Sequence, residues 1–375
     1  MNRRQFLHAG SLGALALCAC TPARRERAFD AIVALDPVAR DGVSTYPTLA
    51  AAIAAAPAGG TRPYRVRVTR GRWREKLVID KPHIHLVGDD RRACVLTFDA
   101  AARDRRTGGD VWGTWGSASV IVRAPDFSAT RLTIENTFDY PGELGKAGHD
   151  LIGPNGLQAV ALMLDEGSDR ASVHDCDILG HQDTVFVDAG RSLFRDCRIA
   201  GSVDFIFGGG NAWFERCELH SRHRPARERQ GMVAVPSTPL DQYFGLSFAG
   251  CRLTRARGLP DASVVLGRPW RPTRTFADGR YGDARAVGAA VYNHCWMDGH
   301  IAPEGWDPMA YTARDGTRVL LQPGDARLFE YASRGPGAHA TAQRRQLPVP
   351  DVQRFTRGRA MAGWFPLDQP HGAGD

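Results

Sequence analysis

The heptapeptide Ser-Val-His-Asp-Cys-Asp-Ile, residues Ser172–Ile178, decides the fold because its pattern recurs along the chain. Each copy has an apolar residue three positions before the cysteine and another two positions after it. Clear copies occupy Leu193–Ile199, Trp213–Leu219 and Ser247–Leu253, and more distant ones Val291–Met297 and Ala129–Ile134. The cysteines of the four clear copies, Cys176, Cys197, Cys217 and Cys251, are 21, 20 and 34 residues apart. Short strands that repeat at about this period predict an all-β fold, a single-stranded parallel β-helix.

The intervals between repeats indicate where other elements are added. The long interval between Cys217 and Cys251 predicts an inserted loop, which carries Arg222, Arg224, Arg227 and Arg229. Thr48–Pro57 is rich in alanine and predicts a short helix that caps the N-terminal end of the coil stack. We expect the segment from about Arg344 onward to pack irregularly along the outside. No linker-like break follows residue 30, so we expect residues 30–375 to form one domain.

Two aspartates occupy the same phase of successive repeats. Asp183 lies in Gly-His-Gln-Asp-Thr, and Asp204 lies in Gly-Ser-Val-Asp-Phe-Ile-Phe-Gly. Each follows a repeat cysteine by seven residues (183 − 176 and 204 − 197). On neighbouring strands their carboxylates would lie roughly 5 Å apart. Two acids at that separation rarely ionise together, so one is expected to keep a proton while the other is charged, as hydrolysis requires.

Composition narrows the choice of partner. The chain has 375 residues, a hydrophobic content of 43% and a formal charge of +7. A basic surface suits an acidic partner, but no nucleic-acid recognition motif is present, so we expect no nucleic-acid partner. An acidic polysaccharide fits the charge. We expect a monomer.

The eight cysteines do not form a metal-site pattern, because no CxxC pair has matching histidines. The repeat cysteines are expected to form a buried ladder in one inward slot of successive coils. Cys197 and Cys217 share that slot at a Cα separation of roughly 5 Å, which a disulfide permits. We therefore consider a Cys197–Cys217 disulfide, with Cys176 as the competing partner of Cys197.

The N-terminus reads as a targeting segment. Asn2–Leu7 resembles a twin-arginine export signal, and the apolar run Ala9–Ala19 is too short to span a membrane. Leu-Cys-Ala-Cys at Leu17–Cys20 resembles a bacterial lipobox, with Cys20 as the lipidated residue. This predicts a signal peptide at residues 1–19, a linker at 20–29 and an exported protein. Thr21 favours an outer-membrane lipoprotein; otherwise the protein is periplasmic or secreted through an ordinary cleaved signal.

Several blocks resemble the pectin methylesterases, or pectinesterases. The signature blocks are Gly180–Thr184, Gly201–Gly208 and Leu266–Trp270, and Gly156–Leu162 resembles a fourth. Tyr46–Ile53, Leu86–Asp89, Ile134–Thr137 and Phe329–Ala338 extend the likeness over roughly residues 30–340. Thr275–Trp306, with its long insertion, looks closer to bacterial members. The family's fold is a right-handed parallel β-helix, which agrees with the repeat, and the family needs no metal or organic cofactor.

The resemblance implies a role for each matching residue. Asp204 would be the nucleophile and Asp183 the general acid and base. Gln158 and Gln182 would donate hydrogen bonds to the oxyanion, and Arg268 would orient Asp204. The substrate would be methyl-esterified pectin, an acidic polysaccharide. Gln158 has an alternative as a member of an internal amide ladder.

Four further residues are candidates for substrate contact. The resemblance places Trp270 at the sugar cleft, and Trp306 is a weaker candidate; both could instead be packing residues. His181 stands where the family commonly has an aromatic residue. Its imidazolium could attract a free carboxylate at mildly acidic pH, or the ring could be partly buried and stacked. Strand alternation places Phe205 and Phe207 on one face of the strand and Ile206 on the other. The face that carries Phe205 and Phe207 is either core or cleft.

Three alternatives stay open at this point. The chain could be another pectin-active β-helix enzyme, a polygalacturonase or a pectate lyase, although the calcium ligands of a lyase are not evident. It could be an esterase for a different acyl substrate, because fold alone does not fix function. It could also be a non-catalytic polysaccharide-binding surface protein, against which the joint presence of Asp183, Asp204 and Arg268 argues.

Overall fold

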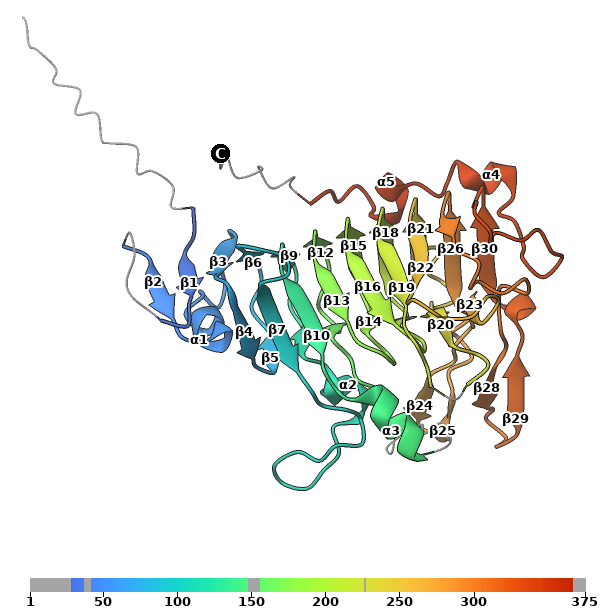
Figure 1. Cartoon of the computed structure of the whole chain (residues 1–375), viewed down its shortest axis with the longest axis horizontal. Helices are drawn as coiled ribbons and strands as arrows, with labels where there is room; N and C mark the ends of the chain where they lie inside the picture. The colour runs from blue at the N-terminus through green and yellow to red at the C-terminus, as the bar shows by residue number, and fades with distance from the viewer. Residues whose placement is uncertain (1–27, 37–41, 148–155, 226, 367–375) are drawn as a thin grey trace, which may run out of the picture.

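The computed structural model describes residues 28–36, 42–147, 156–225 and 227–366, and the predicted signal segment, with Cys18 and Cys20, lies outside them. Over the described residues the chain winds through successive coils of parallel strands (Figure 1). Crossover connections between parallel strands are right-handed almost without exception. The parallel β-helix expected from the repeat is confirmed, with the right hand that the resemblance implies.

Three long sheets form the walls of the helix. Sheet A contains, in spatial order, β2 (Ser44–Tyr46), β1 (Ala31–Val33), β3 (Tyr64–Val68), β6 (Ile84–Gly88), β9 (Ser128–Thr130), β12 (Ala171–His174), β15 (Arg191–Arg195), β18 (Asn211–Glu215), β21 (Leu246–Ala249), β26 (Ala289–Asn293) and β30 (Arg327–Tyr331). Sheet B contains β27 (Trp296–Met297), β22 (Arg252–Arg255), β19 (Glu218–Ser221), β16 (Arg198–Gly201), β13 (Asp177–Leu179), β10 (Thr133–Asn136), β7 (Cys94–Phe98) and β4 (Gly71–Arg74). Sheet C contains β23 (Val264–Gly267), β20 (Gly231–Pro236), β17 (Ile206–Gly208), β14 (Val185–Val187), β11 (Leu162–Leu164), β8 (Val120–Val122) and β5 (Leu77–Ile79).

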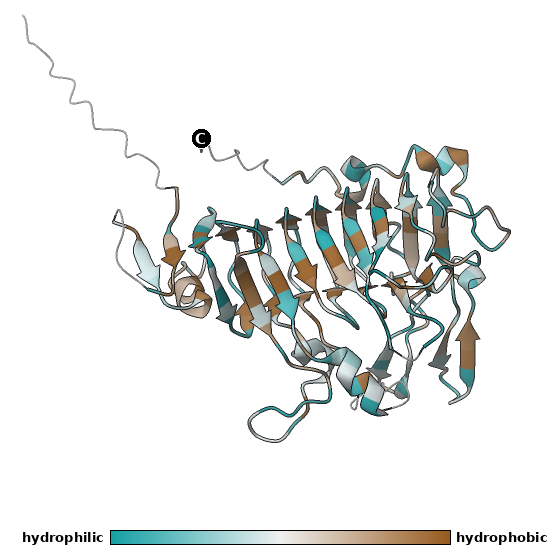
Figure 2. Ribbon diagram, viewed as in Figure 1, coloured by the Kyte–Doolittle hydropathy of each residue, from teal (hydrophilic) through white to brown (hydrophobic). Residues whose placement is uncertain are grey.

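The interior is built from equivalent side chains stacked coil upon coil. Phe194, Phe214, Phe248 and Tyr292 are partners in the register of sheet A, and their ring centroids are 4.7, 4.8 and 4.4 Å apart in sequence order. Stacked aromatic pairs contribute about 0.5–1.5 kcal/mol beyond the area they bury. Figure 2 shows strands that carry both apolar and polar residues. Along β3, buried Val66 and Val68 alternate with Arg65 and Arg67, because successive side chains point to opposite faces.

The cysteine ladder is present, but the proposed disulfide within it is wrong. Cys197 and Cys217 are buried free thiols, like the other repeat cysteines. The Cys197 thiol lies 3.4 Å from the Val173 carbonyl oxygen, and the Cys217 thiol lies 3.5 Å from the Phe194 carbonyl oxygen. Each thiol thus has a backbone acceptor in the preceding coil, and the slot is filled by packing without a covalent bond.

The N-terminal end of the stack is covered by α1 (Leu49–Ala54), as predicted. The hydroxyl oxygen of Thr48 accepts a hydrogen bond from the backbone N–H of Ala51 at 3.1 Å and so caps the helix. Leu49 and Ile53 of α1 are buried in the interior cluster. In the part of the chain that the structure describes, no helix is long and apolar enough to cross a membrane.

Insertions between strands gather on one side of the stack, at the bottom of Figure 1. They are α2 (Gly113–Ser117), α3 (Tyr140–Ala147), the hairpin of β24 (Thr273–Phe276) and β25 (Gly279–Gly282), and the hairpin of β28 (Met309–Thr312) and β29 (Arg318–Leu321). A short 3-10 turn, Pro323–Asp325, precedes β30.

The C-terminal segment crosses the opposite side of the view. It contains α4 (Val349–Val352) and α5 (Arg357–Ala360), and residues 349–366 are called the strap below. The expectation that the tail packs along the outside is confirmed for these residues, although the tail starts from a buried anchor. Arg344 is 1% exposed and forms two hydrogen bonds with the Glu330 carboxylate, at 2.6 and 2.5 Å.

Candidate active site

The two aspartates occupy equivalent corners of neighbouring coils. Asp183 lies in the turn between β13 and β14, and Asp204 lies in the turn between β16 and β17. Val185 pairs with Ile206, so the same register two residues earlier places Asp183 opposite Asp204. Both have left-handed backbones, with φ of 65° and 51°, which Asp tolerates better than most residues. The side-by-side placement is as predicted, although the residues lie in turns and not in strands.

Arg268 follows β23, two strands along sheet C from β17. Its Nε atom donates to Asp204 Oδ1 at 3.0 Å, and its Nη2 atom donates to Oδ2 at 2.5 Å. Burial alone would lower the pKa of Arg268, but the Asp204 carboxylate outweighs it and the pKa is raised. This two-pronged ion pair fixes the plane of the Asp204 carboxylate and neutralises its charge in a largely buried place.

Asp183 has the opposite electrostatic environment. Burial raises the pKa of its carboxyl group well above the usual value, and the neighbouring Asp204 charge raises it further. Arg268 opposes this shift but does not cancel it. The corner therefore holds a carboxylate bound to arginine beside a carboxyl group that keeps its proton.

The two glutamines come from adjacent coils. The backbone N–H of Ala159 donates to the Gln182 carbonyl oxygen at 3.1 Å, so Gln158 and Gln182 stand within one residue of the same register. The Gln158 side chain is 9% exposed, and its Oε1 atom has no hydrogen-bond partner among the described residues. A Cβ atom on Gly156 would lie 1.7 Å from that oxygen, so a larger residue at this position would displace the Gln158 side chain.

Four aromatic side chains form a row on the outer face of sheet C, called the aromatic row below: Trp115, Phe186, Phe207 and Trp270. Phe186 stacks on Phe207 with centroids 4.3 Å apart, Trp115 meets Phe186 edge-on at 5.1 Å, and Trp270 meets Phe207 at 5.8 Å. A cavity of about 320 Å³ beside the row is lined by both of its end members, Trp115 and Trp270. Of these four, Trp270 is the one that the resemblance places at the sugar cleft, and Phe207 is on a face predicted to be either core or cleft. Phe186 and Phe207 each stand three residues after a site aspartate, a spacing that marks both.

Two predicted substrate contacts are wrong. Phe205 is fully buried in the interior cluster together with Ile206, because the turn at Asp204 breaks the alternation expected of a strand. Trp306 is 4% exposed and belongs to the same interior cluster, with its ring 5.9 Å from Tyr292. The backbone of Trp306 forms a parallel β-bridge with Gly267 at the end of β23. Trp306 thus continues sheet C by one position, and its side chain points inward.

His181 is an aromatic packing residue and not a cationic one. Its ring stacks on Tyr140 with centroids 5.5 Å apart and planes inclined by 17°. Burial, and then the charge of Arg222, lowers the His181 pKa to about 3. The imidazole is therefore neutral at mildly acidic pH, and the expectation that it attracts carboxylates there is wrong.

The arginine-rich insertion contacts the chain next to the Asp183 turn. Arg222 donates to the Gly180 carbonyl oxygen at 2.7 Å, just before the Asp183 turn. Arg229 pairs with Asp307 at 3.2 Å and also contacts Glu304. Among the described residues, no group of three or more His, Cys, Asp or Glu side chains could hold a metal ion.

A family model described as Pectinesterase matches residues 36–349 of the chain. The chain belongs to the pectinesterase family, whose members are carboxylic ester hydrolases. It is 39% identical to Pectinesterase A of Dickeya dadantii over 326 residues, which is 86% of this chain and 88% of that relative. The family expected from the sequence blocks is confirmed.

Solved structures agree with this assignment. The pectin methylesterase PemA from Erwinia chrysanthemi matches with a TM-score of 0.85 at 40% identity, covering 91% of this chain and 99% of that one. A pectin methylesterase in complex with a hexasaccharide matches at the same TM-score with 39% identity, over 91% of this chain and 99% of that one. The enzyme from carrot matches with a TM-score of 0.67 at 28% identity, over 89% and 92% of the two chains.

We predict that Asp183→Asn raises stability increasingly as pH rises. The folded-state pKa of Asp183 lies above its unfolded value, so the unfolded chain releases this proton first. Between a pH of about 4 and the raised folded-state pKa, each rise in pH therefore favours unfolding of the wild type through Asp183. Asparagine does not ionise, so across this range the melting temperature of the variant should exceed that of the wild type by a margin that widens with pH. A margin that stays constant or narrows would contradict the assigned protonation state.

Proposed function

We propose that this pectinesterase removes methyl esters from the galacturonate units of pectin through a covalent acyl-enzyme, with Asp204 as nucleophile. The observation that carries the proposal is the asymmetric carboxyl pair. One member is held as a carboxylate by two hydrogen bonds from Arg268, and the other keeps its proton through burial. A nucleophile and an acid side by side are what ester cleavage needs.

The first half of the reaction follows from these positions. An oxygen of the Asp204 carboxylate attacks the ester carbonyl carbon and forms a tetrahedral oxyanion. The amide groups of Gln158 and Gln182 donate hydrogen bonds to that oxyanion, and loss of one such donor typically costs about 3 kcal/mol of barrier. The carbon–oxygen bond to the methoxy group breaks, and Asp183 gives its proton to the leaving oxygen. Methanol departs, and an anhydride joins Asp204 to the sugar carboxyl group.

The second half returns the enzyme to its starting state. Asp183, now a carboxylate, takes a proton from a water molecule that attacks the anhydride. The bond to Asp204 breaks, Asp204 leaves as a carboxylate and Asp183 is protonated again. The sugar is released as a carboxylic acid, which loses its proton to solvent and becomes galacturonate. Arg268 stays bound to Asp204 and favours its departure as a carboxylate.

The aromatic row supplies the platform for the sugar chain in this proposal. Pyranose rings present apolar C–H faces, which pack on aromatic side chains such as Trp270. Trp270 is half-buried against Phe207 and lines the cavity of about 320 Å³ beyond it. The hexasaccharide carried by a solved relative supports an extended sugar site of this kind.

We predict that Asp204→Asn lowers kcat for methanol release from highly methylated pectin by at least about 10⁴-fold, because an amide is a poor nucleophile. Asp175→Asn is the matched control, since Asp175 also has a left-handed backbone, with φ of 51°, at a corner away from the site. It should retain wild-type activity. Circular dichroism should show both variants folded. Substantial methanol release by Asp204→Asn would contradict the mechanism, and new reducing or unsaturated ends without methanol would indicate a chain-cleaving enzyme.

We also propose that the protein is exported and anchored through a lipid on Cys20, with residues 1–19 removed, residues 20–29 as a linker and residues 30–375 as the catalytic domain. The support is the sequence alone: the twin arginines, the short apolar run and the lipobox-like Leu17–Cys20. A bacterial lipoprotein is held firmly because it carries several acyl chains. Mass spectrometry of the mature N-terminus should find an acylated Cys20 in the membrane fraction. A soluble protein with a free amino terminus elsewhere would contradict the anchor.

A further inference from the structure

The outer face of sheet A changes from polar to apolar side chains along its length. Register pairs Ser128 with Ser172, Ser172 with Leu193, and Leu193 with Trp213, so these four side chains form one outward row. The strap covers the apolar part of the row: Ala360 and Met361 pack against Leu193 and Trp213. Arg357 of the strap also binds Glu215 at 3.0 Å. Over the serine part of the row, Trp364, Phe365 and Pro366 of the strap line hollows together with Ser128 and Ser172.

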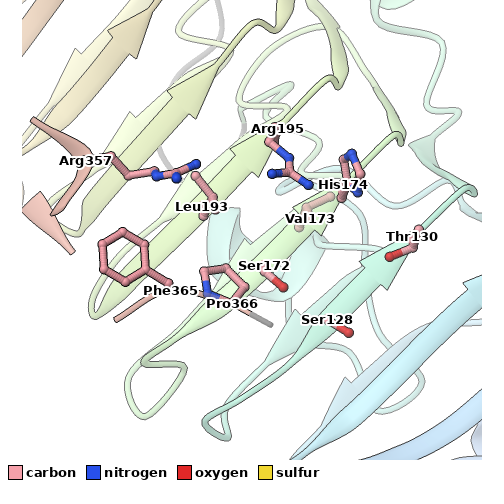
Figure 3. Close-up of a pocket in the computed structure, with 10 residues that line it drawn as sticks. All are labelled: Ser128, Thr130, Ser172, Val173, His174, Leu193, Arg195, Arg357, Phe365 and Pro366. Carbon is pink, nitrogen blue, oxygen red and sulfur yellow. The ribbon is translucent and has the colours of Figure 1, made fainter. Parts of the chain in front are cut away.

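A hollow opens where the row changes from leucine to serine. Its volume is about 220 Å³, and its floor is formed by Ser128, Thr130 and Ser172. Arg195 lies at one rim, and Arg357 and Phe365 of the strap lie at another (Figure 3). Figure 3 shows the three hydroxyl groups on neighbouring strands, with Phe365 and Pro366 beside Ser172. The floor is low because serine and threonine side chains are short.

The hollow continues toward the N-terminal coils. A second hollow of about 500 Å³ shares Ser128, Ser172 and Phe365 with the first and adds Arg65 and Arg170. The two together cross β15, β12, β9, β6 and β3, which is four strand spacings or roughly 19 Å. We call this continuous feature the sheet A groove. It is long enough for several sugar units and lies on a different wall from the Asp183–Asp204 corner.

The lining of the sheet A groove has more cations than anions. Arg65, Arg170, Arg195 and Arg357 line it, against a single carboxylate, Asp126. Asp126 is already bound by Arg170 through two hydrogen bonds of 2.7 Å. Arg195 and Arg357 pair with Asp196 and Glu215, and Arg170 also pairs with Asp169, so these three charges are balanced beside the groove. Each guanidinium group carries five N–H donors that match carboxylate acceptors, so the groove suits a ligand with carboxylates through hydrogen bonding.

Ser128 supplies a second, independent observation. It is 6% exposed, and its hydroxyl group has no hydrogen-bond partner among the described residues, although it belongs to the lining of both hollows. Buried hydroxyl groups almost always have a partner. A ligand that carries hydroxyl groups or carboxylates would provide one.

We propose that the sheet A groove is a second polysaccharide site, which binds a run of galacturonate units with free carboxylates. Arginine matches a carboxylate, serine and threonine match sugar hydroxyls, and the exposed ring of Phe365 offers a stacking face. This inference rests on pectin as the proposed substrate. The product of ester removal is the anionic polymer itself, so the groove holds the enzyme on chains it has already de-esterified.

Affinity electrophoresis in gels that contain polygalacturonate tests the proposal, because this polymer has no ester to cleave. Arg195→Gln and Phe365→Ala are the groove variants; Arg195 is on a rim and Phe365 is 55% exposed, so the interior stays intact. The matched control is Arg252→Gln, which removes one exposed arginine from the outer face of sheet B. Loss of one charge-assisted hydrogen bond should raise the apparent Kd of Arg195→Gln for polygalacturonate about tenfold.

The expected pattern has three parts. Both groove variants lose retardation, Arg252→Gln keeps it, and a neutral galactan retards none of the proteins. On short methyl-esterified oligomers the groove variants keep the wild-type kcat, while KM rises for long, partly de-esterified pectin. Equal retardation of all proteins, equal loss in Arg252→Gln, or binding of neutral galactan would overturn the groove. Absence of methanol release from the wild type would instead overturn the proposed function, and it is read in a separate assay.

Discussion

The parallel hydrogen-bond ladder between coils is the constraint on which the rest of the structure depends. It places residues of equal phase about 4.8 Å apart, whatever their side chains are. Inside the helix this produces the Phe194–Phe214–Phe248–Tyr292 stack and the file of free cysteines. At one corner it places Asp183 against Asp204, an arrangement that two carboxylates would avoid on a flexible surface.

Two carboxyl groups held this close cannot easily both be charged, and this gives Asp183 and Asp204 different protonation states. Arg268 binds one carboxylate with two hydrogen bonds, and burial keeps the proton on the other. The two residues are alike in type and backbone conformation, so their difference comes from their surroundings alone. A buried carboxyl group that must stay neutral is a stability burden at high pH, and such burdens are typical of catalytic sites.

Much of the fold and of the central site could be predicted from the sequence, because both follow from the position of each residue within the repeat. The heptapeptide repeat indicates the coil, and the shared offset from Cys176 and Cys197 pairs the two aspartates. Phase does not show where a strand ends and a corner begins, which is why Phe205 was predicted to face substrate. The inward position of Trp306 and the absence of a Cys197–Cys217 disulfide depend on how the interior is packed, and Trp115 comes from an insertion that the repeat does not position. The sheet A groove depends on how the strap lies over the serines of β9 and β12, and the strap has no periodic pattern from which to predict its path.

The central claim is that Asp204 becomes covalently acylated, and trapping of the anhydride tests it most directly. Wild-type enzyme would be mixed with methyl-esterified oligogalacturonate in the presence of hydroxylamine, which converts an anhydride into a hydroxamate. Peptide mapping by mass spectrometry should find a substrate-dependent hydroxamate on Asp204 and none on Asp183. An enzyme that turns over fully under these conditions, with Asp204 unmodified and no hydroxamate on the sugar, would contradict the account.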